Sequence, residues 1–302
     1  TPGRAQDLID QGKLHLDAVQ ITALDEADQM ADMGFLPQVR KLLRLTPAQG
    51  QRLLFSATLD GDVNKLVEQF LHDPVVHSTA PVQAAVDSMS HHLFFVGERP
   101  ARNEVVLRIA ARQGKTIMFM RTKHGVDRQV KKLRRSGINA YPLHGDKGQG
   151  ARTRAIEGFA DGSIPVLVAT DIAARGIDIA DVSLVVHVDP PAEHKAYLHR
   201  AGRTARGGAA GTVITLVMDE QRKEVASLIK KAGVTATEHD ISHRENPAGA
   251  PILKEITGAR KPNGPALPPP GQYSPQKPAK SVKKSNSQRR RSGGKVARRR
   301  RR

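Results

Sequence analysis

Hydrophobic residues in this chain fall in short runs, and the segments between the runs have helical spacing. The runs predict strands over residues 19–24, 52–55, 75–77, 116–120, 140–143, 166–169, 184–188 and 212–217. Several runs are apolar throughout, which is typical of strands that helices cover on both faces. The intervening segments predict helices over residues 63–71, 102–112, 125–135, 151–159 and 221–231. This alternation predicts an α/β fold with mostly parallel sheets.

The pattern weakens between residues 78 and 92, where Pro81 and several polar residues predict a linker. We therefore expect four regions: part of a first domain over 1–80, a linker over 81–89, a second domain over 90–235, and a tail over 236–302. The first region holds three expected strands, which is small for an α/β domain with both faces covered. We expect it to be a fragment with an incomplete core and unpaired strand edges.

Positive charge is concentrated at the end of the chain. The net charge is +18, and residues 260–302 carry 15 Lys or Arg with no Asp or Glu, which leaves +3 for residues 1–259. The tail has too few large apolar residues to form a core, so we expect it to be disordered. Its density of positive charge predicts contact with RNA or another polyanion. The alternative is a solubilising terminus without a specific ligand.

Composition excludes some classes of site. The 302 residues contain no cysteine, which excludes disulfides and thiolate metal sites and fits a reducing compartment. No apolar run is long enough to cross a bilayer. The opening residues 1–4 have neither the apolar core nor the charged region of a secretory leader. We expect a cytoplasmic protein, monomeric, that does not bind membranes.

Polar clusters follow the predicted strands at the ends where ligands collect in open α/β sheets. These clusters are Asp25-Glu26-Ala27-Asp28, Ser56-Ala57-Thr58, Thr122, His144-Gly145-Asp146 and the segment from Thr170 to Asp178. Each has a structural alternative, such as a helix cap at Ser56 or a turn at Gly145. Several such clusters in one chain favour a shared ligand site.

Two further segments contain glycine and arginine at informative positions. In the segment 170–178, Gly176 would let the backbone approach a phosphate or sugar beside Asp171, Arg175 and Asp178. The segment 199–208 reads HRAGRTARGG and places three arginines three residues apart. On a helix these would share one face and could bind phosphate oxygens. The alternative is a solvated basic helix face, which the glycines of the segment disfavour.

In this order, the motifs resemble those of DEAD-box ATP-dependent RNA helicases of superfamily 2, of bacterial type. The matching segments are Thr1-Pro2-Gly3-Arg4, Asp25-Glu26-Ala27-Asp28 with Met33-Gly34-Phe35, Ser56-Ala57-Thr58, His144-Gly145-Asp146 with Gln149, Arg152 and Phe159, then Thr170 to Asp178 and His199 to Arg206. The resemblance covers residues 1 to about 235. It implies two RecA-like parallel-sheet domains, the first one incomplete, followed by the basic tail.

The resemblance also implies roles for individual residues. Asp25 would hold Mg²⁺ through water, and Glu26 would act as general base for hydrolysis of ATP. Arg203 and Arg206 resemble arginine fingers, which contribute roughly 10³–10⁵ in rate. The residues that would bind ATP are Gly176 and Asp178. Those that would couple hydrolysis to domain closure are Asp28, Ser56, Thr58 and His199. Those that would contact the RNA backbone, without reading sequence, are Thr1, Pro2, Gly3, Arg4, Gly145, Thr170 and Arg175.

The chain departs from the family pattern in two ways. Ala205 stands where the last motif usually has glycine, which a helical backbone would tolerate. The family's adenine-reading, phosphate-binding and first RNA motifs, which lie upstream in the family, have no counterpart in these residues, so we expect an N-terminally truncated form. Gly114-Lys115-Thr116 resembles the end of a phosphate loop, but Ile109 occupies the place of its first glycine and a strand follows it. We expect a turn there.

Three functions are compatible with these observations. The first is an ATP-dependent RNA helicase that separates short duplexes and remodels RNA–protein complexes. The second is an RNA-binding fragment that acts through the second domain and the tail without turning over ATP. The third is a related DNA translocase, which the intact motifs at residues 1–4 and 25–28 disfavour.

Overall fold

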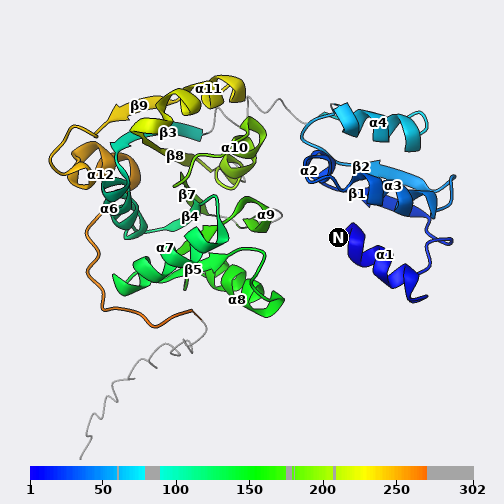
Figure 1. Ribbon diagram of the computed structural model, residues 1–302, viewed down its shortest axis with the longest axis horizontal. Coiled ribbons are helices and arrows are strands. Elements are labelled where there is room, and N and C mark those ends of the chain that lie inside the picture. Colours follow the sequence, from blue (N-terminus) through cyan, green and yellow to red (C-terminus); the bar gives the residue numbers. More distant parts are fainter. Residues whose placement is uncertain (60, 79–88, 175–178, 180, 207–208, 271–302) are drawn as a thin grey trace, which may run out of the picture. The chain divides into compact units, whose positions relative to one another are not determined.

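The structure is a computed structural model that describes residues 1–59, 61–78, 89–174, 179, 181–206 and 209–270 (Figure 1). The chain divides into two units, Thr1–Thr79 and Ala80–Arg302. The division falls beside the boundary expected at residue 80. Each unit has its own parallel sheet.

The first unit is built around two parallel strands. Its elements are α1 (Pro2–Asp10), β1 (Ile21–Leu24), α2 (Ala27–Asp32), α3 (Leu36–Arg44), β2 (Gln51–Leu54) and α4 (Gly61–Phe70). Leu24 and Leu54 pack on a small core from α3 and α4. On the other face of the sheet, Ile21 and Phe55 are 60% and 55% exposed. The described part of this unit thus covers only one face of its sheet.

The second unit contains a seven-stranded sheet with the order β5-β6-β4-β7-β8-β3-β9, in which every pairing is parallel. The strands are β3 (Met89–Gly97), β4 (Lys115–Phe119), β5 (Ala140–Leu143), β6 (Val166–Ala169), β7 (Val182–His187), β8 (Gly211–Met218) and β9 (Thr237–Asp240). The α-helices are α6 (Arg99–Ala110), α7 (Lys123–Arg135), α8 (Gln149–Ala160), α9 (Asp171–Ala174), α10 (His194–Ala201), α11 (Arg222–Ala232) and α12 (Pro251–Thr257). The described residues of this unit also form the 3₁₀ helices η2 (Asp219–Gln221) and η3 (Pro247–Gly249).

Helices cover both faces of this sheet, as the continuous apolar strands predict. Along β4, Met118 contributes to the core beneath α6, α7 and α12, whereas Ile117 and Phe119 contribute to the core beneath α8, α10 and α11. This alternation follows from the two-residue period of a strand. All three side chains are at most 1% exposed. The second unit is therefore a complete three-layer α/β sandwich.

Several expected elements differ from the structure. The strand expected at 75–77 is absent, and Val75 and Val76 are 79% and 69% exposed. The linker expected up to residue 89 ends one residue earlier, where β3 begins, and β3 is a central-sheet strand that pairs with β8 and β9. Polar residues at the start of β3 hide its strand character in the sequence.

The boundary expected at residue 235 is also wrong. Strand β9 extends the sheet beyond β3, and helix α12 adds Leu253, which is fully buried, to the core beneath α6 and α7. Residues 258–270, here called the strap, then run in extended form beside α6 and α7 (Figure 1). They dock through hydrogen bonds and through Ala259, which is 4% exposed and belongs to the core, and composition alone does not reveal such contacts.

The strap is fastened by backbone contacts. The Arg260 N–H donates to the carbonyl oxygen of Arg108 over 3.0 Å, and the Leu267 N–H donates to that of Arg134 over 2.8 Å. Gly137 has φ +80°, and a Cβ there would lie 2.3 Å from the carbonyl oxygen of Gly264. Only glycine allows this approach. The described strap is thus part of the second unit.

A histidine–tyrosine cluster lies inside the second unit. His91 Nδ1 lies 2.9 Å from the Tyr197 hydroxyl, and His187 Nδ1 lies 3.1 Å from Thr215 Oγ1. Burial lowers the pKa of His91 to about 4, with a smaller contribution from His92. Burial and the nearby Arg200 charge hold the pKa of His187 well below its ordinary value. Both rings are therefore neutral near pH 7.

These lowered pKa values predict acid sensitivity. Because the unfolded chain takes up protons near pH 6.5 and the folded His91 does so near pH 4, stability should fall as pH drops between these values. Each such histidine contributes at most about 1.4 kcal/mol per pH unit. Urea unfolding should be followed by tyrosine fluorescence, since the three tyrosines (Tyr141, Tyr197 and Tyr273) all belong to residues 80–302. His91→Asn should give a shallower dependence on pH, and an unchanged slope would contradict the assignment.

Candidate functional site

In the first unit, two candidate motifs meet at the carboxyl ends of β1 and β2. The Phe55 N–H donates to the carbonyl oxygen of Leu24 over 2.7 Å, and the Ala27 N–H donates to that of Phe55 over 3.1 Å. These bonds continue the parallel pairing past the ends of the strands. The sequences 25–28 and 56–58 therefore lie side by side, as their positions after neighbouring strands predict.

Asp28 and Ser56 connect the two motifs directly. The Asp28 N–H donates to Ser56 Oγ over 3.2 Å, and the same hydroxyl donates to the carbonyl oxygen of Thr58 over 2.6 Å. Asp28 is only 2% exposed. A movement of either loop would therefore be transmitted to the other through this hydroxyl.

Glu26 has a strained backbone at this site. Its φ is +52°, in the left-handed region that non-glycine residues seldom adopt. Such a conformation costs on the order of 1–3 kcal/mol and concentrates at functional sites. The neighbouring Asp25 is exposed, and its Oδ1 accepts the Glu26 N–H over 2.8 Å. The turn thus presents two adjacent carboxylates at the end of a strand.

Residues Thr1 to Arg4 form the start of α1, where Thr1 is the N-cap residue and Pro2 occupies the first turn. Arg4 is exposed and pairs with Asp7 on the same helix. The guanidinium is available at the surface for a phosphate, because an exposed ion pair of this kind is weak.

In the second unit, four neighbouring strands bring further candidates to one edge. The order β5-β6-β4-β7 places the residues that follow these strands next to one another, and all four strands run in the same direction. Thr122 follows β4, Gly145 follows β5, Thr170 follows β6 and Asp189 follows β7. The chain leaves β4 toward α7 on one face and leaves β6 toward α9 on the other. Ligands bind where neighbouring strands diverge in this way.

The loop after β5 is fixed by ion pairs. Lys147 Nζ and His144 Nε2 lie 2.8 Å and 3.1 Å from the same oxygen of Asp127. Burial alone would raise the pKa of Asp127, but these two partners outweigh it and hold the pKa below its usual range. Gly145 is exposed, and no atom lies within 4 Å of the place a Cβ would take. The turn leaves open space for a ligand backbone.

Arg200 joins the residues that follow β6 and β7 at this edge. It is 3% exposed, its Nη2 donates to Asp171 over 2.9 Å, and its Nη1 donates to the carbonyl oxygen of Asp189 over 2.8 Å. Its guanidinium also lies 5.1 Å from the centre of the Phe119 ring. Asp189 in turn accepts from Arg102 over 2.8 Å. The partners of this buried cation are oxygens of the protein itself.

The prediction that three arginines share one helix face is wrong. Helix α10 ends at Ala201, because the following residues turn back toward β8, so only Arg200 of the three lies in the helix. Arg203 and Arg206 lie beyond it, and their Nε atoms donate to the carbonyl oxygens of His199 and Gly202 over 3.3 and 3.0 Å. His199 and Arg203 border the same shallow hollow as Asp171. Arg203 and Arg206 are thus held by the backbone of the preceding turn.

The helical backbone that would tolerate Ala205 in place of glycine is absent. Its φ is +54°, in the left-handed region, and it lies between the two arginines. The preceding Thr204 is 1% exposed and donates its hydroxyl to the carbonyl oxygen of Val182. A glycine would adopt this conformation with less strain than alanine.

Three of the expected site residues, Arg175, Gly176 and Asp178, lie outside the described residues. In the described ranges, no three His, Asp or Glu side chains gather in a way that could hold a metal ion. The same ranges contain no helix of the length and hydrophobicity that crossing a membrane requires.

Sequence reasoning missed Asp189 and the role of Arg200. Asp189 follows a strand in the same manner as the other candidates, so the same rule would have found it. No local signal separates Arg200 from Arg203, because burial of one and not the other depends on the end of α10 and on the distant Asp171.

Two protein families match this chain. Residues 1–66 match the family described as DEAD/DEAH box helicase, and residues 101–208 match the helicase conserved C-terminal domain. Among curated proteins, the ATP-dependent RNA helicase RhlB of Pseudomonas syringae pv. tomato is 39% identical over 237 residues, which cover 77% of this chain and 59% of the relative. RhlB of Pseudomonas aeruginosa is 41% identical over 73% of this chain and 56% of its own length. The chain thus spans under two thirds of these relatives.

Solved structures agree with this match. Dbp5 of S. cerevisiae, solved bound to RNA and ADP BeF3, has a TM-score of 0.74 and 29% identity over 85% of this chain and 68% of Dbp5. Its L327V variant, with the same ligands, has a TM-score of 0.75 at 29% identity and the same coverage.

The positive φ of Ala205 predicts that Ala205→Gly stabilises the second unit. The left-handed conformation penalises alanine by more than glycine's entropic cost, so we expect a gain of about 1 kcal/mol. Urea unfolding followed by tyrosine fluorescence measures it. Ala210→Gly is the matched control, since Ala210 is exposed and has no positive φ, and it should be neutral or slightly destabilising. Equal effects of both substitutions would show that Ala205 is not strained.

Proposed function

Because this chain belongs to the DEAD-box family of RNA helicases, we propose that it forms the hydrolytic half-site and the second unit of an ATP-dependent RNA helicase. The activity would couple ATP hydrolysis to local unwinding of RNA duplexes and remodelling of RNA–protein complexes. The observation that carries the proposal is the bond from the Asp28 N–H to Ser56 Oγ, because it joins the candidate hydrolytic turn to the candidate coupling turn.

The hydrolytic chemistry would lie at the end of β1. The exposed carboxylate of Asp25 is a hard oxygen ligand and fits Mg²⁺ held through water. Bound Mg²⁺ would neutralise charge on the ATP phosphates. Glu26 would accept a proton from the attacking water, and its strained backbone would fix the direction of its carboxylate. Asp28, anchored to Ser56, would then pass any shift of this turn to Thr58.

The second unit would supply positive charge to the reaction. Arg203 and Arg206 would act as arginine fingers. Their guanidinium groups are held by the carbonyl oxygens of His199 and Gly202, at the end of α10 and just beyond it. Arg200 would not serve in this way, because it is buried on Asp171 and Asp189. Gly176 and Asp178, which would bind ATP, remain predictions from sequence.

RNA would be bound at the start of α1 and at the carboxyl edge of the second unit's sheet, without reading of its sequence. Arg4 is exposed at the start of α1, within the motif Thr1-Pro2-Gly3-Arg4. Gly145 leaves open space beside the loop after β5, and Thr170 follows β6, the adjacent strand. Arg175 would belong to the same surface. RNA choice would then depend on strand shape and 2′-hydroxyls.

A second candidate function is RNA binding without ATP turnover. The sequence of 302 residues contains no G-x-x-x-x-G-K-[ST] loop, and in the structure Gly114, the nearest resemblance, has φ +95° directly before β4. A phosphate loop must follow a strand. On this candidate, the second unit and the 13 Lys or Arg of residues 271–302 would hold RNA. Cytoplasmic location and a monomeric state remain predictions from sequence.

We expect the polypeptide 1–302 to show no RNA-stimulated ATP hydrolysis. The β- and γ-phosphates would lack the backbone amides and lysine that hold them, so Glu26 would have no positioned substrate. Phosphate release with saturating single-stranded RNA measures this. Turnover by 1–302 that Glu26→Gln abolishes would contradict the expectation.

A chimera separates the two candidate functions. If the portion of Pseudomonas syringae RhlB that precedes its matching region is joined before Thr1, the helicase proposal expects RNA-stimulated turnover to appear. Glu26→Gln in the chimera should abolish it, whereas RNA binding should persist. A folded chimera that binds RNA but hydrolyses no ATP would favour the binding function instead.

The basic segment after Pro270 should add phosphate contacts. Because residues 258–270 belong to the folded unit, the deletion should remove residues 271–302 only. We expect weaker binding to single-stranded RNA, and a log–log salt dependence that is shallower by about 0.7 for each phosphate that the shortened chain no longer neutralises. A control in which residues 271–302 are replaced by an uncharged Gly/Ser chain of equal length should match the deletion. An unchanged salt dependence would show that the segment does not engage RNA.

A further inference from the structure

We propose that single-stranded RNA leaving the carboxyl edge of the second unit enters a lateral pocket beside β5 and stacks a base on Tyr141. The pocket has a volume of about 670 Å³. Its lining residues are Asp127, Val130, Lys131, Arg134, Arg135, Tyr141, Pro142, Lys147, Ala151, Arg154, Leu267, Pro269 and Pro270. This volume is within the range of small-ligand sites and is large enough for a nucleotide. The inference rests on the proposed RNA binding and adds a place and a chemistry to it.

The pocket extends from the candidate RNA edge along the free side of the sheet. Strand β5 is the edge strand, and Lys147 follows its carboxyl end two residues after Gly145. From α7, the lining residues recur at helical spacing from Asp127 to Arg135, which spans about 12 Å. Single-stranded RNA that passes Gly145 would therefore reach Lys147 first and Arg135 last.

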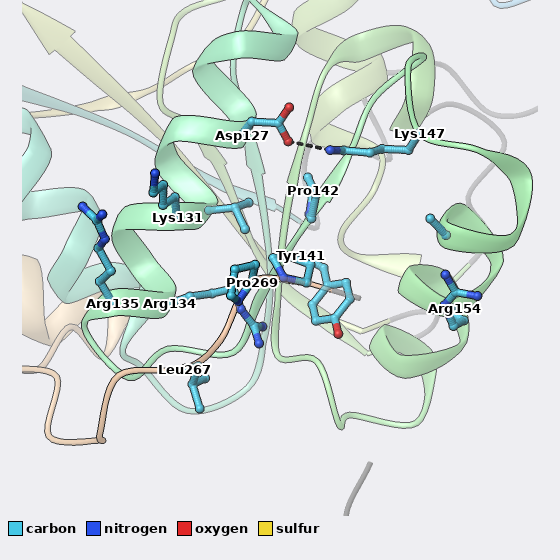
Figure 2. Close-up of a pocket in the computed structure, with 13 residues that line it drawn as sticks. Asp127, Lys131, Arg134, Arg135, Tyr141, Pro142, Lys147, Arg154, Leu267 and Pro269 are labelled. Carbon is cyan, nitrogen blue, oxygen red and sulfur yellow. Dashed lines mark ion pairs between the residues drawn. The ribbon is translucent and has the colours of Figure 1, made fainter. Parts of the chain in front are cut away.

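The charge of the lining matches a polyanion. Five cations line the pocket, and Asp127 is its single carboxylate. Asp127 is already matched by Lys147, whose Nζ lies 2.8 Å away (Figure 2). His144 Nε2 lies 3.1 Å from the same carboxylate. Lys131, Arg135 and Arg154 are exposed side chains around it. An anion would therefore meet a net positive surface.

Tyr141 makes a nucleotide a better fit than another polyanion. The guanidinium of Arg134 lies 5.1 Å from the centre of its ring, and Figure 2 shows the ring between Arg134 and Arg154. Arg134 is 1% exposed and its Nη1 donates to Asn139 over 2.6 Å, so the ring rests on a fixed partner. An aromatic ring held among arginines is a stacking platform for bases. A chain of carboxylates gains nothing from such a ring.

The strap contributes the third wall and connects the pocket to the basic end of the chain. Leu267, whose N–H is bonded to the carbonyl oxygen of Arg134, lines the pocket together with Pro269 and Pro270. The 13 Lys or Arg of residues 271–302, with no acid among them, follow Pro270 directly. RNA in the pocket would thus lie at the point where the basic segment leaves the described unit.

Reversing the charge of exposed cations around the lateral pocket tests whether RNA enters it. The full chain with Lys131→Glu and Arg154→Glu is compared with a control carrying Lys223→Glu and Lys230→Glu. These are two exposed lysines of α11, which packs on β3 and β8 rather than on β5. Fluorescence anisotropy measures affinity for labelled oligouridylates of about 6 and about 18 nucleotides. We expect the pocket variant to lose at least about fivefold affinity for the long RNA, with a shallower salt dependence and unchanged binding of the short RNA. Equal losses in both variants would overturn the pocket.

Two substitutions of Tyr141 test whether a base stacks on its ring. Tyr141→Phe keeps the ring and should bind the long RNA as the wild type does, whereas Tyr141→Leu should lose about fivefold. Circular dichroism confirms that both variants are folded. Equal affinity of the two variants would overturn stacking.

Two further measurements identify what a failure would mean. Competition with an acidic peptide tests whether the pocket binds RNA or acidic peptides, and binding of the short RNA tests the proposed function apart from the pocket. An oligoglutamate that displaces the long RNA as well as an oligouridylate of equal charge would assign the pocket to acidic peptides and overturn the inference. Failure of the wild-type chain to bind even the short RNA would refute the proposed function itself. Normal binding of both RNAs by the pocket variant would refute only the lateral pocket.

Discussion

Parallel pairing of neighbouring strands is the constraint on which both candidate sites depend. In a parallel sheet every strand ends at the same edge, so residues far apart in the chain are brought together by pairing alone. In the first unit this pairing places Asp28 against Ser56. In the second unit it gathers the loops after β5, β6, β4 and β7. The chemistry of each site is thus supplied by loops, and its geometry by the sheets beneath them.

Buried arginines hold the second unit's loops in place. Removing a guanidinium from water is costly unless its donors are satisfied. Arg200 meets this condition with Asp171 and the carbonyl oxygen of Asp189. Arg134 meets it with Asn139 and the carbonyl oxygen of Pro268 in the strap. The first arginine fixes the edge proposed to bind RNA, and the second fixes one wall of the lateral pocket.

These features combine into one view of RNA binding by this DEAD-box chain. The carboxyl edge of the second unit would hold the backbone, the pocket beside β5 would receive the strand as it leaves, and the basic segment would add affinity that depends on salt. Each contribution has a different physical signature, namely backbone geometry, aromatic stacking and counterion release. ATP hydrolysis at the turn of residues 25–28 would affect this RNA binding only through closure of the two domains.

Much of the architecture could be predicted from the sequence, because its determinants are local. Apolar periodicity predicted β4 within one residue of each end, and it predicted β5 (140–143) and β6 (166–169) with the bounds that the structure has. Strand β3 has three polar residues, Ser90, His91 and His92, directly after Met89, and β9 is polar throughout, so both were missed. The strap was missed because backbone hydrogen bonds and the close approach of Gly137 to Gly264 hold it, and neither has a compositional signal.

The site shows the same division. Motif order and the rule that ligands collect at strand ends were enough to select Asp25, Glu26, Asp28 and Ser56 from the sequence alone, since each depends on its position after one strand. Only the tertiary structure decided that Arg200 is a buried structural cation while Arg203 and Arg206 lie beyond the helix. It also decided that Ala205 adopts a left-handed backbone and that five cations from α7, α8 and the loop between β5 and α8 share a pocket with the strap. Burial and partner choice depend on residues remote in the chain, and no local pattern contains them.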